Sequence, residues 1–298
     1  SDADIHAIAT AFTPLLEATN RRVLLPIQFL HKLPLSNNKK YQGYIKTLDD
    51  IIYRIIKERK ATDDKPLDLL QMLIDATDEA TGLPLTDQEL RNEAMTMFIA
   101  GHETTANAMC WLWTILSTQS EIRTKIEHEV DEVLGGRTPV AADFPNLPYC
   151  LKAFKETMRL YPPVPILPRH VEKDATLGQY HLKGGSDVLF SPYLLHRHPD
   201  FWDQPEVFDP HRFDEAAQRQ RHTYAYIPFG GGPRICLGNN FALMEAVFII
   251  AMTTQRFQLN LHANAKIDAL IGLTTRPKYG VPVVLKRRQA AKKNLLTK

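Results

Sequence analysis

The chain has 298 residues, of which 44% are hydrophobic and 23% are charged, with a formal net charge of +2. This composition is too apolar for a disordered protein and is typical of a globular protein with a substantial core. The small net charge argues neither for nor against a nucleic-acid partner, and we expect none.

From the N-terminus onward, apolar residues recur mostly at helical spacing. Helices are predicted at residues 5–21, 40–60, 67–77, 87–117, 121–134, 147–160 and 240–256, with a connection at 26–38. Thr86 and Glu89 form a capping box before the fourth helix, and Gly135 ends the fifth. Pro148 fits the first turn of the sixth helix, and Pro162 stops it.

Two regions show the shorter period of strands. Residues 170–191 predict a small antiparallel sheet with a turn at Gly184 and Gly185. A second hairpin is predicted near the end of the chain, in which residues 271–277 pair with residues 281–285. The fold class is therefore mainly α with small antiparallel β-sheets, in a single domain over residues 1–298.

The three cysteines, Cys110, Cys150 and Cys236, are far apart and odd in number. They fit a reducing compartment and exclude a disulfide framework. No run approaches the roughly 20 apolar residues of a membrane span, and the first residues do not resemble a signal peptide. We therefore expect a cytoplasmic location, with anchoring by a segment outside this sequence left open.

The segment from Phe229 to Gly238 is crowded with glycine and carries one cysteine near its end. Glycine allows a tight turn and a close approach of the backbone to a bulky ligand. An iron held by a thiolate needs such a site, with a flat macrocycle against the backbone and one sulfur at the metal. A glycine-rich turn with a buried free cysteine is the alternative interpretation.

This segment resembles the haem-binding loop of the cytochromes P450, Phe-x-x-Gly-x-Arg-x-Cys-x-Gly. Phe229, Gly232, Arg234, Cys236 and Gly238 fill its defining positions. The resemblance implies haem b as cofactor, with Cys236 as the iron ligand. It extends along the whole chain but covers only the C-terminal part of the family's fold, without the first helices and much of the larger sheet. The residues that it places at the haem are Cys236, Arg234, Arg169, Phe229, Gly230, Gly238, Ala100, Pro228 and Ile235.

Arg234 and Arg169 are the candidates for the haem propionates, because a guanidinium binds a carboxylate with two parallel hydrogen bonds. Phe229 is expected to pack near the sulfur and help keep water out. The helix that begins just after Cys236 is expected to favour a thiolate with the positive end of its dipole. Cys110 and Cys150 are expected to be inert packing residues.

A second polar motif, from Ala100 to Thr105, lies within the predicted helix at 87–117. It is not a zinc-protease motif, because that motif needs a second histidine where Ala106 stands. A polar patch on an amphipathic helix is the simpler interpretation. The resemblance instead implies an oxygen-activation site, in which Glu103 and Thr104 are catalytic residues that deliver protons. The Thr104 hydroxyl is expected to turn toward the carbonyl of Ala100 and loosen the helix.

Glu156 and Arg159 are spaced to share one helix face, and alone they would be an ordinary surface ion pair. Their surroundings resemble the family's Glu-x-x-Arg element, with Arg212 as its third member. We expect these residues to pin the core near the haem loop, in a structural role.

The substrate pocket is expected to be apolar, which predicts a hydrophobic small-molecule substrate. Its predicted lining is formed by residues 98–100, 164–167 and 273–274. The resemblance implies a monooxygenase that takes electrons from a separate ferredoxin, flavodoxin-like or flavoprotein reductase partner. Arg219 and Arg221 are the candidates for docking an acidic partner.

Two alternatives to a monooxygenase remain open. One is a peroxide-using or isomerising haem enzyme of the same fold. The other is a non-enzymatic haem-binding or interaction fragment, because the resemblance covers only part of the family's fold. The uncovered apolar surface also predicts a possible oligomer.

Overall fold

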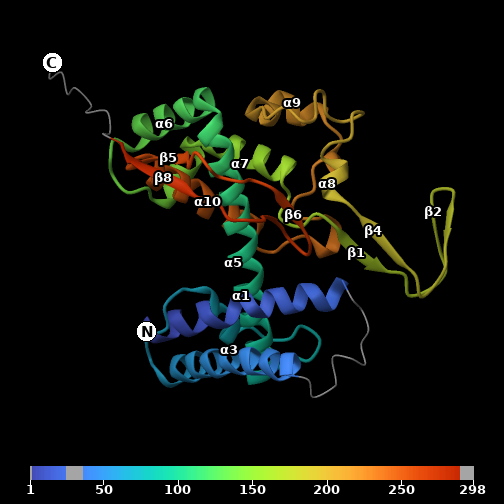
Figure 1. Cartoon of the computed structure of the whole chain (residues 1–298). Helices are drawn as coiled ribbons and strands as arrows, with labels where there is room; N and C mark the ends of the chain where they lie inside the picture. The colour runs from blue at the N-terminus through green and yellow to red at the C-terminus, as the bar shows by residue number, and fades with distance from the viewer. Residues whose placement is uncertain (1, 25–35, 289–298) are drawn as a thin grey trace. The chain divides into compact units, whose positions relative to one another are not determined.

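The computed structural model describes residues 2–24 and 36–288 of the chain (Figure 1). The chain divides into two compact units, Ser1–His102 and Glu103–Lys298. The single domain expected from the sequence stays a prediction. In the described part of the chain, no helix combines the length and the apolarity needed to cross a membrane.

The first unit consists of helices that pack around a small apolar core. Its helices are α1 (Asp2–Leu24), α3 (Ser36–Ala61), α4 (Leu69–Asp75) and the first half of α5 (Asp87–Thr118). Helices α1 and α3 pack against each other (Figure 1). Ala11, Leu15, Leu48 and Met95 are buried between the helices, as the helical spacing of apolar residues requires.

The predicted helices are confirmed, with boundaries that differ by a few residues. The capping box forms as expected, since the Thr86 amide donates to Glu89 Oε2 at 2.8 Å and the Glu89 amide donates to Thr86 Oγ1 at 3.3 Å. The predicted connection at 26–38 falls mostly outside the described residues, and its last residues already belong to α3.

The second unit is built around the longer helices that follow. These are the remainder of α5, then α6 (Ser120–Leu134), α7 (Pro148–Leu160) and α10 (Asn239–Thr254), with short helices α8 (Pro192–Leu195) and α9 (Glu215–Gln220). Short 3₁₀ turns lie at Ala141–Asn146, Pro210–Phe213, Thr223–Ala225 and Gly232–Arg234. Leu112, Ile126, Phe154 and Ile250 are among the residues buried between the long helices. Helix α6 ends at Gly135, which adopts φ 56° as predicted for its C-cap.

The described strands form two-stranded antiparallel sheets only. Strand β1 (Leu167–His170) pairs with β4 (Asp187–Phe190), and β2 (Ala175–Leu177) pairs with β3 (Tyr180–Leu182). This confirms the small antiparallel sheet predicted at residues 170–191. Farther along, β5 (Phe257–Leu261) pairs with β8 (Val283–Arg287), and β6 (Ala269–Ile271) pairs with β7 (Thr275–Pro277).

The predicted pairing of residues 271–277 with residues 281–285 is wrong. The chain turns earlier, at Gly272, whose amide donates to the Thr274 carbonyl at 3.1 Å, so that β6 and β7 form the hairpin. Strand β8 instead adds to β5, a strand that the sequence analysis did not predict. The β5–β8 ladder pairs Phe257–Leu261 with Val283–Arg287, five residues on each strand.

Candidate functional site

The loop that precedes Cys236 owes its shape to glycine. Gly230 and Gly232 have φ values of 73° and 69°, a left-handed conformation that other residues adopt only with strain. The amide of Cys236 donates to the Phe229 carbonyl at 2.9 Å and closes the loop. The cysteine therefore stands at a fixed point of the backbone.

The loop is also packed closely against its neighbours. A Cβ added at Gly231 would lie 2.9 Å from Tyr224 Cε1, closer than such contacts allow. A Cβ at Gly230 would lie 3.8 Å from Leu167 Cδ1, so the loop runs beside the start of strand β1. Two of the segments predicted to hold the cofactor, the cysteine loop and β1, are thus neighbours within the second unit.

Cys236 is the exposed cysteine of the chain, whereas Cys110 is half-buried and Cys150 is buried. Burial raises the pKa of both inner thiols, as expected for inert packing residues. Large apolar side chains beside Cys236 also face outward, with exposed fractions of 52% for Ile235, 86% for Leu237 and 68% for Phe241. An exposed thiol can bind a metal, and the apolar side chains beside it can pack against an apolar ligand, so the site fits a metal-containing apolar ligand.

The two arginines predicted to hold carboxylates lie on these same segments. Arg234 ends the 3₁₀ turn before Cys236 and is exposed. Arg169 lies in β1, where its Nη1 donates to the Pro168 carbonyl at 2.8 Å. Neither guanidinium makes an ion pair with another residue that the structure describes. A thiol can hold a haem iron, an apolar surface can pack on the porphyrin, and the two guanidinium groups can bind its carboxylates, so these residues fit that cofactor.

Pro228 and Phe229 lead into the loop, and their position depends on a histidine that the sequence analysis missed. The amide of Ile227 donates to Nε2 of His196 at 2.8 Å. Burial lowers the pKa of His196 to about 3, so the ring is neutral and can accept this bond. No periodicity or motif in the sequence marks this histidine. Phe229 is half-buried and packs against the core of the second unit.

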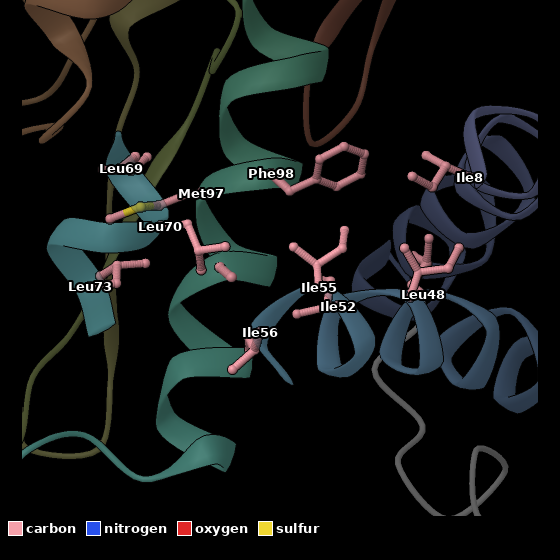
Figure 2. Close-up of a pocket in the computed structure, with 12 residues that line it drawn as sticks. Ile8, Leu48, Ile52, Ile55, Ile56, Leu69, Leu70, Leu73, Met97 and Phe98 are labelled. Atoms are coloured by element: carbon pink, nitrogen blue, oxygen red, sulfur yellow. The ribbon is translucent and has the colours of Figure 1, made fainter. Parts of the chain in front are cut away.

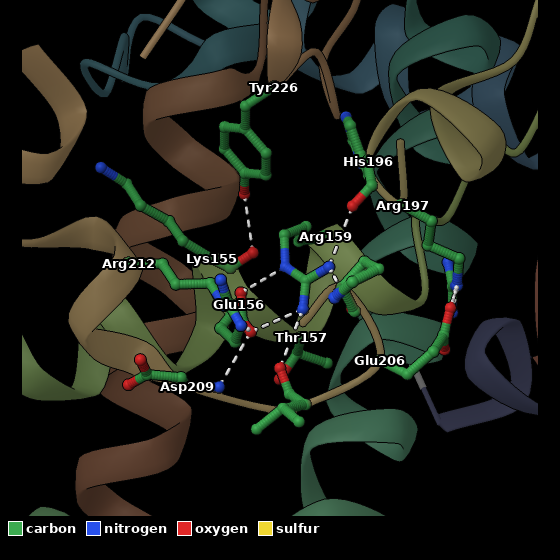
Figure 3. A network of polar contacts seen from close by, with 12 residues as sticks. Lys155, Glu156, Thr157, Arg159, His196, Arg197, Glu206, Asp209, Arg212 and Tyr226 are labelled. Atoms are coloured by element: carbon green, nitrogen blue, oxygen red, sulfur yellow. Dashed lines mark hydrogen bonds and ion pairs between the residues drawn. The ribbon is translucent and has the colours of Figure 1, made fainter. Parts of the chain in front are cut away.

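The predicted Glu156–Arg159–Arg212 cluster is present, with Glu156 and Arg159 buried and Arg212 half-buried (Figure 3). Arg159 donates to both carboxylate oxygens of Glu156, at 2.7 and 2.8 Å, and Nε of Arg212 lies 3.5 Å from Glu156 Oε1. Arg159 also donates to three backbone carbonyls, those of His196, Pro205 and Val207. This arginine therefore ties helix α7 to the chain that leads toward the cysteine loop.

The two predicted catalytic residues are in the part of α5 that belongs to the second unit. Glu103 is half-buried, and its Oε1 accepts a hydrogen bond from Thr274 Oγ1 at 2.8 Å and one from Asn107 Nδ2 at 3.5 Å. Thr104 is also half-buried. Ala100 lies on the same helix within the first unit and is exposed. The contact of Glu103 with Thr274 joins two segments that were predicted separately.

The segments predicted to line a substrate pocket fall in both units. In the second unit, the Thr275 amide donates to the Pro163 carbonyl at 2.9 Å, which brings residues 273–274 next to the start of residues 164–167. In the first unit, Phe98 lines an apolar cavity of about 420 Å³, together with side chains from α1, α3 and α4 (Figure 2). A single pocket formed by all three segments stays a prediction.

The basic residues predicted to dock an acidic partner differ in their surroundings. Arg219 is exposed and pairs with Glu215. Arg221 packs over the Trp202 ring at 4.0 Å, and its Nη2 donates to the Arg212 carbonyl at 2.5 Å. Arg221 is half-buried and packs within the unit, and the docking role of both arginines stays a prediction.

Comparison with known proteins identifies the family. The model of the family described as cytochrome P450 matches residues 3–283. The chain belongs to the cytochrome P450 family. Haem is the cofactor of this family, and its members are oxidoreductases of the monooxygenase type. Cyclooctatin synthase of Streptomyces melanosporofaciens is 37% identical over 288 residues, which are 95% of this chain and 63% of that protein. Protein LUTEIN DEFICIENT 5, chloroplastic, of Arabidopsis thaliana is 34% identical over 307 residues, covering 96% of this chain and 50% of that protein.

Solved structures agree with this assignment. The haem domain of cytochrome P450DA matches 94% of this chain with a TM-score of 0.83 and 28% identity, over 62% of its own length. The cytochrome P450 named CYP102L1 matches 95% of this chain with a TM-score of 0.84 and 26% identity, over 65% of its own length. The mainly helical P450 fold with small antiparallel sheets is thereby confirmed. The chain spans between half and two thirds of the length of these relatives.

Proposed function

We propose that this chain carries the haem-thiolate site of a monooxygenase that inserts one oxygen atom of dioxygen into a hydrophobic small molecule. Electrons come from a separate protein, a ferredoxin, a flavodoxin-like protein or a flavoprotein reductase. The observation that carries the proposal is the exposed Cys236 thiol, held at the end of a glycine-shaped loop among outward-facing apolar side chains.

In this proposal, Cys236 holds the haem iron through its sulfur, and Arg234 and Arg169 bind the haem carboxylates. The bound haem, with a thiolate ligand, supplies the cleavage of the O–O bond. Ile235, Leu237 and Phe241 exclude water by packing on the ligand. Glu103 and Thr104 bind and move protons. Thr274 donates a hydrogen bond to the Glu103 carboxylate.

The first test is a spectrum of the purified chain loaded with haem, reduced and exposed to carbon monoxide. A strongly red-shifted Soret band supports thiolate ligation. A band like that of haemoglobin would mean that the sulfur is not the ligand, and would contradict the assignment of Cys236. A chain that takes up no haem would favour the interaction-fragment alternative.

The second test is turnover with a ferredoxin and its reductase, using dodecanoic acid, 7-ethoxycoumarin and geranylgeraniol as apolar probes. The proposal predicts an oxygenated product from at least one probe, formed with dioxygen and electrons. Product formed with hydrogen peroxide but not with dioxygen and electrons would instead favour the peroxide-using alternative. Thr104→Ala should leave electron consumption in place and lower the yield of product about tenfold or more, because proton delivery is disturbed. A variant coupled as tightly as the wild type would contradict the role of Thr104.

A further inference from the structure

We propose that Thr274 is a positioning residue that holds the carboxyl group of Glu103 in place for proton delivery. The inference rests on the proposed function, because it assigns a partner to one of the two proposed catalytic residues. The contact joins the tip of the β6–β7 hairpin to helix α5, two segments of the second unit that are far apart in sequence.

The tip of this hairpin is anchored on both sides of Thr274. The Gly272 amide donates to the Thr274 carbonyl at 3.1 Å and fixes the turn. The Thr275 amide donates to the Pro163 carbonyl at 2.9 Å, and the Thr275 carbonyl accepts from the indole N–H of Trp111 at 3.1 Å. Trp111 lies two turns after Glu103 on α5, so the hairpin tip is tied to the helix that carries the carboxyl group. The Thr274 hydroxyl is therefore presented to Glu103 by a fixed backbone.

The contact itself is short and directed at one oxygen. Thr274 Oγ1 lies 2.8 Å from Glu103 Oε1, whereas Asn107 Nδ2 is 3.5 Å from the same oxygen and contributes little. Because both contacts use Oε1, neither occupies Oε2. Thr274 thus holds Oε1 of the carboxyl group. Neither Thr274 nor Asn107 blocks the exchange of a proton at Oε2.

A hydroxyl group suits this task better than a cation would. It donates to the carboxylate, and by rotating its hydrogen it accepts from the protonated carboxylic acid. Lysine or arginine would bind only the charged carboxylate and would oppose the protonation of that carboxylate. A threonine partner can therefore keep the Glu103 side chain in one position through a full cycle of proton uptake and release.

The adjacent threonine provides a matched control. Thr275 is buried, and its hydroxyl has no hydrogen-bond partner among the described residues. Its backbone makes the anchoring bonds, but its hydroxyl does not. Thr275→Val therefore removes a hydroxyl from the same hairpin without touching Glu103.

The test compares Thr274→Val, Thr274→Ser, Thr275→Val, Glu103→Gln and the double variant Thr274→Val/Glu103→Gln. The readout is product formed per pair of electrons consumed, with whichever of the three probes the wild type oxygenates fastest. Thr274→Val should lower this ratio about tenfold at unchanged KM, because a misplaced proton donor releases oxygen as peroxide. Thr274→Ser should stay within about twofold of the wild type, and Thr275→Val should not differ from it. In the Glu103→Gln background, Thr274→Val should add little.

Two further measurements separate positioning from damage to the fold. Hydrogen peroxide brings its own protons, so peroxide-driven product formation should be the same in Thr274→Val and the wild type. In the purified chain without cofactor, the Gly272 and Thr275 amides should exchange hydrogen about fivefold faster in Thr274→Val, but not in Thr275→Val.

The outcomes distinguish this inference from the proposed function. A wild type that forms no product from any probe overturns the proposed function, and the role of Thr274 with it. A productive wild type whose coupling is unchanged by Thr274→Val overturns the role of Thr274 alone. Equal losses in the dioxygen and peroxide reactions would show a structural effect and would also overturn it.

Discussion

The arginine cluster of α7 and the cysteine loop lie in the same unit, yet they differ in burial and in how far the chain itself supplies partners for their side chains. Arg159 and Glu156 are fully buried, and each is bound by side chains and backbone groups of this unit. Cys236, Arg234 and the apolar side chains beside them are exposed. Burial with complete partners indicates a structural role, and exposure of a thiol with apolar neighbours indicates a ligand site.

The difference predicts opposite responses to mutation. Residues of the cluster should control stability, because removing one leaves buried charges and carbonyls without partners. Residues of the loop should control ligand binding while hardly changing the stability of the chain without ligand.

The largest effect on stability is expected for Arg159→Ala. This change removes two hydrogen bonds from the buried Glu156 carboxylate and takes the Arg159 donor from the carbonyls of His196, Pro205 and Val207. We expect a loss of about 3–5 kcal/mol in the free energy of unfolding, or failure to fold, measured by urea denaturation. Arg219→Ala, at an exposed ion pair, serves as the control and should change it by less than about 1 kcal/mol. Equal effects of the two variants would contradict the structural role of the cluster.

A second effect depends on pH and comes from His196. Its pKa is about 3 in the folded chain, because of burial, against an ordinary value of 6.5. Below pH 6.5 the unfolded chain gains a proton that the folded chain does not, so stability falls as the pH drops from 6.5 toward 3. The slope from this residue approaches about 1.4 kcal/mol per pH unit.

The variant His196→Gln tests this assignment, because the glutamine oxygen can accept the Ile227 amide but does not titrate. Urea denaturation at pH 7.5 and 5.0 should show a smaller loss of stability on acidification in the variant, by roughly 2 kcal/mol. An identical pH dependence in the two proteins would mean that His196 takes up its proton as readily in the folded chain as in the unfolded chain, and would contradict the lowered pKa.

A smaller effect is expected for Glu129, whose carboxylate caps helix α7. It accepts from the amides of Tyr149 and Cys150 at 2.7 and 2.8 Å. Glu129→Ala should cost about 1–2 kcal/mol in the free energy of unfolding, as the loss of a helix cap does. Glu132→Ala, on the exposed face of α6, the helix that carries Glu129, should change stability by less than about 0.5 kcal/mol. Equal changes in the free energy of unfolding of the two variants would contradict the capping role of Glu129.

Much of this arrangement could be predicted from local sequence signals. Helix caps depend on contacts within a few residues, so they can be read from the local sequence. This holds for the capping box of Thr86 and Glu89 and for the C-cap at Gly135. The Glu156–Arg159 pair is likewise set by helical spacing. Its structural role was predicted from the resemblance to a known family.

Features that depend on contacts between distant segments were harder to predict. The pairing of β8 with β5 was missed because a short apolar run does not reveal its partner. The packing of Arg221 on the Trp202 ring could not be predicted either, because Trp202 lies on another segment. His196 and the contact of Thr274 with Glu103 were missed for the same reason, since only the folded chain brings each pair together.

The smallest effect on stability, and the most direct test of the account, is expected for Cys236→Ser. Its side chain is exposed, so the free energy of unfolding of the chain without cofactor should change by less than about 0.5 kcal/mol. The decisive measurement is the ferrous carbon monoxide spectrum after loading with haem. We predict that the wild type shows the red-shifted band of thiolate ligation and that the variant loses it. A variant that keeps its haem and the same spectrum would contradict the claim that this sulfur binds the iron.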